Sequence, residues 1–291
     1  MNNNILLSFL LCTINKEDDF ERSINSLFKN KVDDVSFEVI VVDQGNSESV
    51  STLCKFYGAN YIATNTIGLS VARNIGLKKC KGKYIALMDD DAFIAKNYYK
   101  NLNLIIQNIE LEDFDVISGR IMTIEDNSVA LSRYQDSEKK DINFNNIDVI
   151  LSSALVIKSK VFNTIGNFDE NFGVGAKWGG SEETDLVARI IHKNYLVKYI
   201  PTLVIYHPRT DFDSMSFKDT FYKTYSYGLG RGAFLKKHRY LPKYLKLKNL
   251  FLPILAAFGS FLILRPKEAC RYFSSFLGRL IGYLGYSRHN P

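Results

Sequence analysis

Short apolar runs of strand length alternate with helix-like segments through the first third of the chain. Four runs are rich in aliphatic and β-branched residues and have the length of buried strands: residues 5–12, 37–43, 60–64 and 83–89. The segments between them carry apolar residues at helical spacing: the stretch with Phe20, Ile24, Leu27 and Phe28, then residues 47–57 and 69–80. Strands and helices that alternate in this way predict βαβ units and a mainly parallel sheet.

The second half of the chain is less regular but continues the α/β pattern. Residues 115–119, 149–158 and 196–207 are apolar enough for strands, and residues 181–194 have helical spacing. Glu182, Glu183 and Asp185 fall in the first turn of that helix, where the helix dipole favours negative charge. We therefore expect a Rossmann-like, mainly parallel mixed sheet with flanking helices.

Carboxylates follow two of the predicted strands directly. Asp43 ends the run 37–43, and Asp89, Asp90 and Asp91 end the run 83–89. Sheets of this kind bind ligands just beyond the carboxyl ends of their strands. Three adjacent carboxylates repel one another, and their hard oxygen atoms suit Mg²⁺ or Mn²⁺, which can bridge a diphosphate leaving group. The alternative is a solvated acidic turn.

The C-terminal region differs from the rest in charge and texture. Residues 212–291 contain 14 Lys and Arg against 3 Asp and Glu, whereas residues 1–211 contain 23 against 28. Residues 250–264 form an uncharged apolar run of 15, shorter than the ~20 residues of a spanning helix and interrupted by Pro253. We expect a body at 1–215 and, at 216–291, helices that associate with an anionic membrane surface.

Two alternatives for this C-terminal region stay open, a hydrophobic helical subdomain and the interface of a homodimer. Its long aliphatic runs suit lipid better than a phosphate backbone, so nucleic acid is not an expected partner. The glycines at Gly228, Gly230 and Gly232 do not have the spacing of a dinucleotide fingerprint, and close helix packing is the expected reason for them. The four cysteines form no C-x-x-C pair, which argues against a zinc module or a disulfide framework.

Five motifs stand in the order typical of one enzyme family: Thr13-Ile14-Asn15, Val41-Val42-Asp43, Gly68-Leu69-Ser70-Val71-Ala72-Arg73-Asn74-Ile75-Gly76, Asp89-Asp90-Asp91 and Trp178-Gly179-Gly180-Ser181-Glu182-Glu183-Thr184-Asp185-Leu186. In these residues the chain resembles a family-2 glycosyltransferase of the GT-A fold over about residues 4–210. The resemblance implies an inverting transfer of a sugar from a nucleotide-diphosphate donor, with a UDP-sugar as the first expectation. The implied acceptor is a hydroxyl of a saccharide or lipid-linked saccharide, in capsule, O-antigen or related polysaccharide synthesis.

The resemblance also implies a donor side of the site. The expected nucleotide-sugar contacts are Thr13, Asn15, Asp43, Arg73, Asp89 and Asp90, and the expected ligands of Mn²⁺ or Mg²⁺ are Asp91, Asp89 and His207. Asp43 is expected to accept N3–H of a pyrimidine base, or else to close the turn after its strand. Arg73 is expected to pair with the diphosphate or with the aspartates, or else to lie on the surface over Leu69.

An acceptor side follows from the Trp-Gly-Gly segment. Removal of the acceptor's proton needs a carboxylate base, and the candidates are Glu183 and, in a second alignment, Glu182. The expected acceptor contacts are Trp178, Gly179, Gly180 and Asp185. Trp178 can offer its ring to a sugar face or, alternatively, anchor the core.

Other classes of function remain alternatives to this interpretation. A rhamnosyltransferase with a dTDP-sugar differs only in the donor. A nucleotidyltransferase would normally carry a glycine-rich loop after its first strand, and residues 12–16 lack those glycines. A non-catalytic membrane adaptor explains the C-terminal region but assigns no role to the acidic motifs. For the transferase, we expect a location on the cytoplasmic face of the cell membrane.

Overall fold

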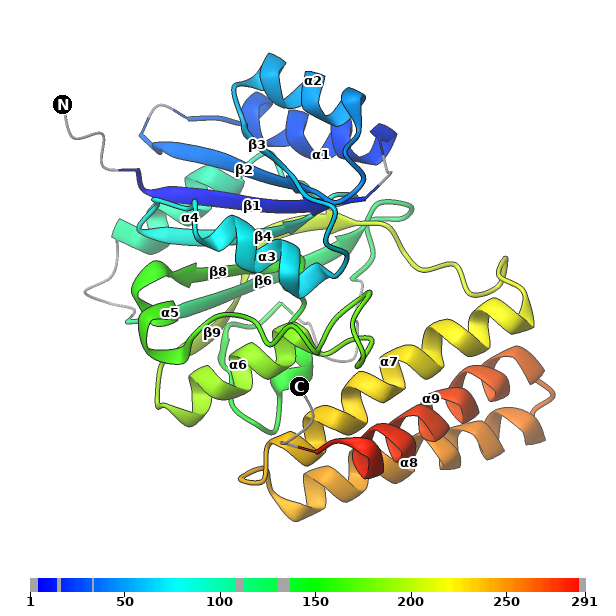
Figure 1. Ribbon diagram of the computed structural model, residues 1–291. Helices are drawn as coiled ribbons and strands as arrows, with labels where there is room; N and C mark the ends of the chain where they lie inside the picture. Colours follow the sequence, from blue (N-terminus) through cyan, green and yellow to red (C-terminus); the bar gives the residue numbers. More distant parts are fainter. Residues whose placement is uncertain (1–4, 15–16, 33, 108–112, 130–136, 288–291) are drawn as a thin grey trace. The chain divides into compact units, whose positions relative to one another are not determined.

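The computed structural model describes residues 5–14, 17–32, 34–107, 113–129 and 137–287 (Figure 1). The chain divides into two compact units. Unit 1 consists of Met1–Ile67, Val71–Phe168 and Leu186–Arg209. Unit 2 consists of Gly68–Ser70, Asp169–Asp185 and Thr210–Pro291. The Trp-Gly-Gly segment falls in unit 2 together with the C-terminal helices.

Unit 1 is built on one mixed sheet with the strand order β3-β2-β1-β4-β8-β6-β9-β5, in which β7 also pairs with β9. The strands are β1 (Leu7–Thr13), β2 (Phe37–Asp43), β3 (Asn60–Ala63), β4 (Tyr84–Asp89), β5 (Phe93–Ile94), β6 (Val116–Thr123), β7 (Lys140–Asp141), β8 (Leu155–Lys158) and β9 (Val197–His207). The first four in sequence are mutually parallel, and β6 is parallel to β9. Strand β8 runs antiparallel to both of its neighbours. The predicted α/β sheet is confirmed.

Helices cover both faces of this sheet. They are α1 (Glu17–Lys29), α2 (Glu48–Tyr57), α3 (Leu69–Leu77), α4 (Tyr98–Gln107), α5 (Ser159–Ile165) and α6 (Glu182–His192). On one face, Phe9 of β1 packs with residues of α1, α2 and α4, and its ring meets Tyr99 edge-on at 5.9 Å. On the other face, Gly76 of α3 lies against Leu10, where an added Cβ would come within 2.2 Å of the leucine side chain. The successive residues Phe9 and Leu10 of β1 thus face opposite helix layers.

Strand register brings the polar strand ends to one edge. Thr13 lies opposite Asp43 in the β1–β2 pair, and Cys12 lies opposite Asp89 in the β1–β4 pair. The carboxyl ends of three parallel strands therefore stop at the same level, as the sequence pattern predicts.

One predicted strand is shorter than expected. Residues 149–158 were expected to be extended throughout, but only β8 is a strand, and two 3₁₀ turns, Ile147–Val149 and Ser152–Ala154, lie around its start. The reason is that β4 pairs with β8 only from Tyr84 to Ala86, so the residues before β8 have no partner strand there. Helices α4 and α5 lie outside the segments for which the sequence pattern predicts a structure.

Unit 2 contains a loop, residues 169–185, and the helices α7 (Phe217–Lys237), α8 (Lys243–Leu262) and α9 (Pro266–Gly285). Helix α9 lies between α7 and α8 and packs against both (Figure 1). Helices α7 and α9 meet through glycines: a Cβ on Gly232 would lie 2.0 Å from the carbonyl oxygen of Arg279, and one on Gly282 2.1 Å from that of Leu229. Close packing is thus why α7 needs glycine, as predicted.

Helix α8 is held to its neighbours by a polar cluster. The guanidinium of Arg231 donates from Nε and Nη2 to Asn249 Oδ1 at 3.1 and 2.8 Å, and Arg279 Nη1 donates to the backbone carbonyl of Asn249. By length and composition α8 is the one helix among the described residues that could cross a membrane, and 28% of its most apolar window is buried. A core helix can meet the same criterion.

Candidate active site

Asp89 and Arg73 form an ion pair at the carboxyl edge of the sheet. Arg73 lies on α3, is 2% exposed, and places Nη2 3.2 Å from Asp89 Oδ1. Its guanidinium also lies 5.3 Å from the ring centre of Phe168. Arg73 is therefore not a surface arginine but the buried partner of the strand-end aspartate, and it fixes which oxygen of Asp89 faces outward.

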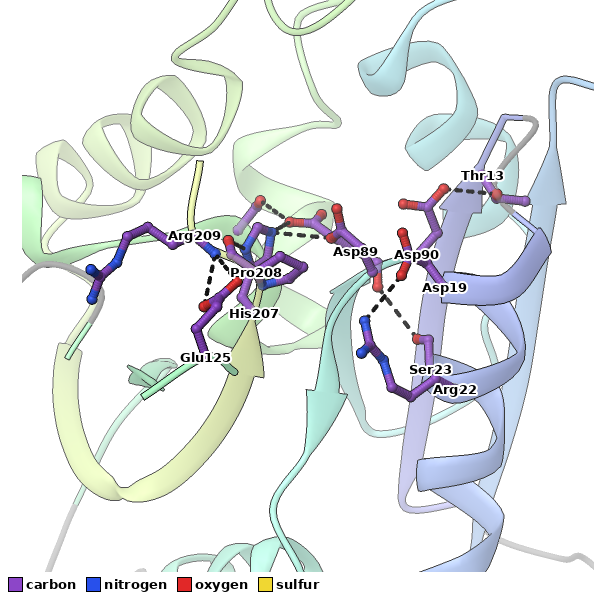
Figure 2. A network of polar contacts seen from close by, with 12 residues as sticks. Thr13, Asp19, Arg22, Ser23, Asp89, Asp90, Glu125, His207, Pro208 and Arg209 are labelled. Carbon is purple, nitrogen blue, oxygen red and sulfur yellow. Dashed lines mark hydrogen bonds and ion pairs between the residues drawn. The ribbon is translucent and has the colours of Figure 1, made fainter. Parts of the chain in front are cut away.

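His207 lies beside Asp89 (Figure 2), and its ring faces both Asp89 and Asp91. Its Nε2 lies 3.2 Å from Asp91 Oδ1 and 3.8 Å from Asp89 Oδ2. Its Nδ1 lies 2.7 Å from the carbonyl oxygen of Pro208, which can only accept, so Nδ1 carries a proton. Burial alone would lower the pKa of His207, but the hydrogen bond to Asp91 and the charges of both aspartates raise it to about 9.

Arg209, just after the end of β9, is held by two acidic residues that the sequence analysis did not predict to be functional. The backbone N–H of Arg209 donates to Glu125 Oε1 at 3.1 Å (Figure 2), and its guanidinium pairs with Asp126 at 3.1 Å. Hydrogen bonds from Thr123 and Ser128 hold the pKa of Asp126 below its usual range. Because Thr123 lies opposite His207 in the β6–β9 register, this turn orients the histidine. The adjacent pair Glu125-Asp126, six residues after the predicted strand 115–119, was the only sequence signal.

The side chains of Thr13 and Asp90 are hydrogen-bonded to each other. Thr13 Oγ1 donates to Asp90 Oδ2 at 2.8 Å, and both side chains are buried (Figure 2). This hydrogen bond joins β1 to the end of β4, and the expected donor contacts of the two residues stay a prediction. Asn15, the third residue of the first motif, lies outside the described residues.

Asp43 closes the turn after β2. Its carboxylate accepts from the backbone N–H of Gly45 at 2.8 Å, from that of Ser47 at 2.7 Å, and from the hydroxyl of Tyr61 at 2.9 Å. The side chain is fully buried. Burial and this hydrogen bond raise the pKa of Tyr61 to about 12. The turn-closing interpretation therefore describes the structure, and the expected contact with a pyrimidine base stays a prediction.

The side chains around His207 are of the types that bind a hard divalent metal ion. No group of three or more His, Cys, Asp or Glu side chains within the described ranges has the arrangement of a ready-made metal site. Two carboxylates and an imidazole nonetheless converge, and the imidazole's other nitrogen is bound to a backbone carbonyl, as in metal-ligating histidines. Asp89, Asp91 and His207 are the residues that would hold Mn²⁺ or Mg²⁺.

Trp178 belongs to the folded loop of unit 2. Its backbone N–H donates to the carbonyl of Asn171 at 2.8 Å, and its carbonyl accepts from Gly173 at 2.9 Å. The indole is 8% exposed and lies 6.0 Å from the ring centre of Tyr286. These contacts favour the alternative that Trp178 is a core anchor over the expected role as a platform for a sugar.

The two glycines after Trp178 lie against α7. A Cβ on Gly179 would lie 1.8 Å from Ser226 Oγ, whereas one on Gly180 would lie 3.3 Å from Tyr227 Cδ1. Both glycines are buried. Packing against Ser226 is thus a structural reason for glycine at position 179, and the expected acceptor contacts of Gly179 and Gly180 stay a prediction.

The glutamates at the start of α6 differ in exposure. Glu182 is 6% exposed and lies beside Gly173, whereas Glu183 is partly exposed. Asp185 is fully buried, and its Oδ1 lies 2.6 Å from Lys237 Nζ and 2.8 Å from His238 Nε2. The carboxylate of Asp185 is thus paired inside unit 2, and its expected contact with an acceptor stays a prediction.

The comparison with known families agrees with these motifs. Residues 8–180, more than half of the chain, match the sequence model of glycosyl transferase family 2. The chain belongs to this family. An uncharacterized glycosyltransferase of Escherichia coli, YibD, is 30% identical over 107 residues, which are 35% of this chain and 30% of the relative. The pre-mycofactocin glycosyltransferase of Mycobacterium tuberculosis is 24% identical over 183 residues, 58% of this chain and 37% of the relative.

The chain spans half or less of the length of the first curated relatives that it matches. Solved structures extend the likeness over the whole chain at the level of the fold. The mannosyltransferase of Pyrobaculum calidifontis in complex with GDP-Man and Mn²⁺ has a TM-score of 0.69 at 11% identity, with 98% of this chain and 89% of that chain covered. Staphylococcus aureus TarS 1-349 in complex with UDP-GlcNAc has a TM-score of 0.59 at 14% identity, with 98% and 93% covered. The fold is GT-A.

Proposed function

We propose that this protein is an inverting glycosyltransferase that moves a sugar from a nucleotide-diphosphate donor to a hydroxyl of a saccharide or lipid-linked saccharide. The carrying observation is the convergence of Asp89, Asp91 and His207 at the carboxyl edge of the sheet in a family-2 chain. The structural neighbours TarS and the Pyrobaculum mannosyltransferase form complexes with UDP-GlcNAc and GDP-Man, which supports a nucleotide-sugar donor. A UDP-sugar is the first donor to test and a dTDP-sugar the second.

On the donor side, this chain's own residues hold and orient charge. Asp89, Asp91 and the Nε2 atom of His207 would hold Mn²⁺ or Mg²⁺, and the Mn²⁺ of the mannosyltransferase complex supports this. When bound, the ion neutralises the charge that develops on the diphosphate leaving group. Arg73 holds one oxygen of Asp89 and so leaves the other toward His207.

On the acceptor side, a carboxylate at the start of α6 takes the proton. The acceptor oxygen bonds to the anomeric carbon, the bond from that carbon to the diphosphate oxygen breaks, and the hydroxyl proton moves to Glu183. Glu183 is preferred because it is partly exposed, while Glu182 is buried beside Gly173. One displacement without a covalent intermediate inverts the anomeric configuration.

Replacement of Glu183 by Gln tests this assignment. Gln keeps the shape but cannot take a proton at neutral pH, so turnover should fall by roughly 10²–10⁴-fold while donor affinity is retained. Glu182→Gln is the matched control and should have the smaller effect. The measurement is transfer with purified donor and acceptor, with the anomer of the product read by NMR. A larger loss at Glu182 would reassign the base, and a retained anomer or release of pyrophosphate would overturn the mechanism.

The outer side of α8 supports attachment to a membrane surface. Large apolar side chains there are exposed at helical spacing: Leu247, Phe251, Leu252, Leu255, Phe258, Phe261 and Leu262. The exposed lysines Lys243 and Lys248 lie in the first two turns of the same helix, and α8 contains no acidic residue. An apolar stripe beside lysines suits the surface of an anionic bilayer, which is where a lipid-linked acceptor would be found.

Vesicle binding tests the membrane proposal. The double variant Leu255→Ser, Phe258→Ser removes two exposed side chains and should weaken binding to vesicles that contain phosphatidylglycerol by roughly tenfold or more. Phe56→Ser is the control, because Phe56 is 80% exposed but lies on α2. The amount bound is measured by co-sedimentation at low and high salt. Equal binding of both variants would overturn the proposal, and a concentration-dependent dimer that Leu255→Ser disrupts would favour the homodimer instead.

A further inference from the structure

One lysine side chain joins the two ends of the loop 169–185. Lys237 Nζ lies 2.7 Å from Asp169 Oδ2 at the start of the loop and 2.6 Å from Asp185 Oδ1 at its end. The same ammonium lies 4.8 Å from the ring centre of Phe172 within the loop. Burial alone would raise the pKa of Asp169, but the hydrogen bond and charge of Lys237 lower it below the usual range. A single residue of α7 thus fixes where this loop begins and ends.

His238 completes the environment of Asp185. Its Nε2 lies 2.8 Å from Asp185 Oδ1, its Nδ1 is hydrogen-bonded with the hydroxyl of Tyr240, and its ring lies 4.8 Å from that of Phe234. His238 is 3% exposed and Asp185 is fully buried. Because a carboxylate accepts only, Nε2 carries the proton in this contact. Both side chains are locked by packing, so the position of Asp185 is strongly determined.

A buried carboxylate is stable only with such partners. Removal of one partner of a buried ion pair leaves an uncompensated charge, which is far more costly than the loss of a surface pair. Asp185 lies in the first turn of α6, two residues after Glu183 and one helical turn after Glu182. Whatever fixes Asp185 therefore fixes the backbone that carries both glutamates.

Helix α7 supports the same loop at a second place. Ser226 and Gly230 of α7 lie against Gly179 and Gly180, so the helix touches the loop both here and at Lys237. Trp178, just before these glycines, lies against the end of α9 at Tyr286. The loop is thus bound to the C-terminal helices along its length.

We propose that Lys237 and His238 are positioning residues that hold the segment from Trp178 to Glu183 in the conformation needed for sugar transfer. This rests on the proposed function, in which a glutamate at the start of α6 is the base. The C-terminal helices are then part of the transfer machinery as well as a surface for lipid. Misplacement of a catalytic group by about 1 Å can cost roughly 10²-fold in rate, so the expected effect falls on kcat.

The chain offers a reporter of loop position that does not depend on activity. Trp178 is the only tryptophan of the protein, and it lies within the loop. Displacement of the loop should shift the emission of Trp178 to longer wavelength and increase its quenching by acrylamide.

The test compares His238→Gln, whose amide nitrogen reaches the place of Nε2, with His238→Asn, whose amide does not. Lys237→Met removes the bridge, and Lys236→Met, whose ammonium lies over Tyr283, is the neighbouring control.

We expect His238→Asn and Lys237→Met to increase quenching at least twofold and to lower kcat by roughly 10–100-fold, with donor affinity within twofold of the parent. His238→Gln and Lys236→Met should behave as the parent. Unchanged quenching in His238→Asn would overturn the positioning role, and so would increased quenching with unchanged kcat. If Lys237→Met does not fold, the Gln and Asn pair at His238 decides alone. Failure of the proposed function has a different signature, since Glu183→Gln would then leave activity unchanged while the quenching response persisted.

Discussion

The sheet edge of unit 1 and the loop of unit 2 place their functional side chains by different means. In unit 1 the aspartates reach one edge because parallel strands end in register, and neighbouring strands supply their partners. In unit 2 the position of Asp185 depends on His238, which lies 53 residues further along the chain. The first arrangement follows from strand register, while the second exists only when the helices have packed.

This difference gives the C-terminal region a second role. Its charge and apolar texture predict helices that associate with a membrane surface. The structure also gives it the partners of Asp169 and Asp185 and the aromatic neighbour of Trp178. The region that suits a lipid surface is also the support of the candidate catalytic loop.

The largest expected effect comes from removal of residues 236–291. The truncated chain lacks Lys237, His238 and Tyr286, so the buried Asp185 loses the ammonium of Lys237 and the imidazole of His238. We expect loss of transfer and a Trp178 emission typical of an exposed indole, measured beside soluble yield. A soluble truncated protein with parental emission and turnover would show that the loop folds without the helices and would break the comparison.

A change on the donor side should spare the loop. Asp91→Ala removes a carboxylate that faces His207, so metal-dependent donor binding should fall by roughly 10–100-fold or more, as in excess chelator. Trp178 emission should stay at the parental value, because the two sites are held by separate contacts. Asp113→Ala, at a carboxylate that is 74% exposed, is the control. Donor binding that survives both the substitution and chelation would contradict the metal assignment.

Substitutions at two helix glycines have the smallest expected effects of the three predictions. Gly230→Ala places a methyl group 2.3 Å from the carbonyl oxygen of Gly180, so the free energy of unfolding should fall by about 1–3 kcal/mol. Gly259→Ala, in α8 with nothing within 4 Å of the added carbon, should raise it by up to about 1 kcal/mol through helix propensity. Urea denaturation measures both. Equal effects of the two substitutions would mean that the loop does not rest on α7 in solution.

The order of strands and helices in unit 1 could be predicted from the sequence because it depends on local periodicity. The runs that end in Asp43 and Asp89 have the composition of buried strands, and parallel strands must bring such ends to one edge. The segment before β8 could not be predicted in this way, because its length as a strand depends on how far β4 pairs with it.

The sequence by itself therefore determined the fold class, the family motifs and the acidic edge. Only the tertiary structure decided which side chains pair with three of the carboxylates. Tyr61 is hydrogen-bonded to Asp43, Thr13 to Asp90, and Lys237 and His238 contact Asp185. The physical reason is that the environment of a carboxylate depends on what the folded chain brings opposite it. Those partners come from distant segments, and no local pattern specifies them.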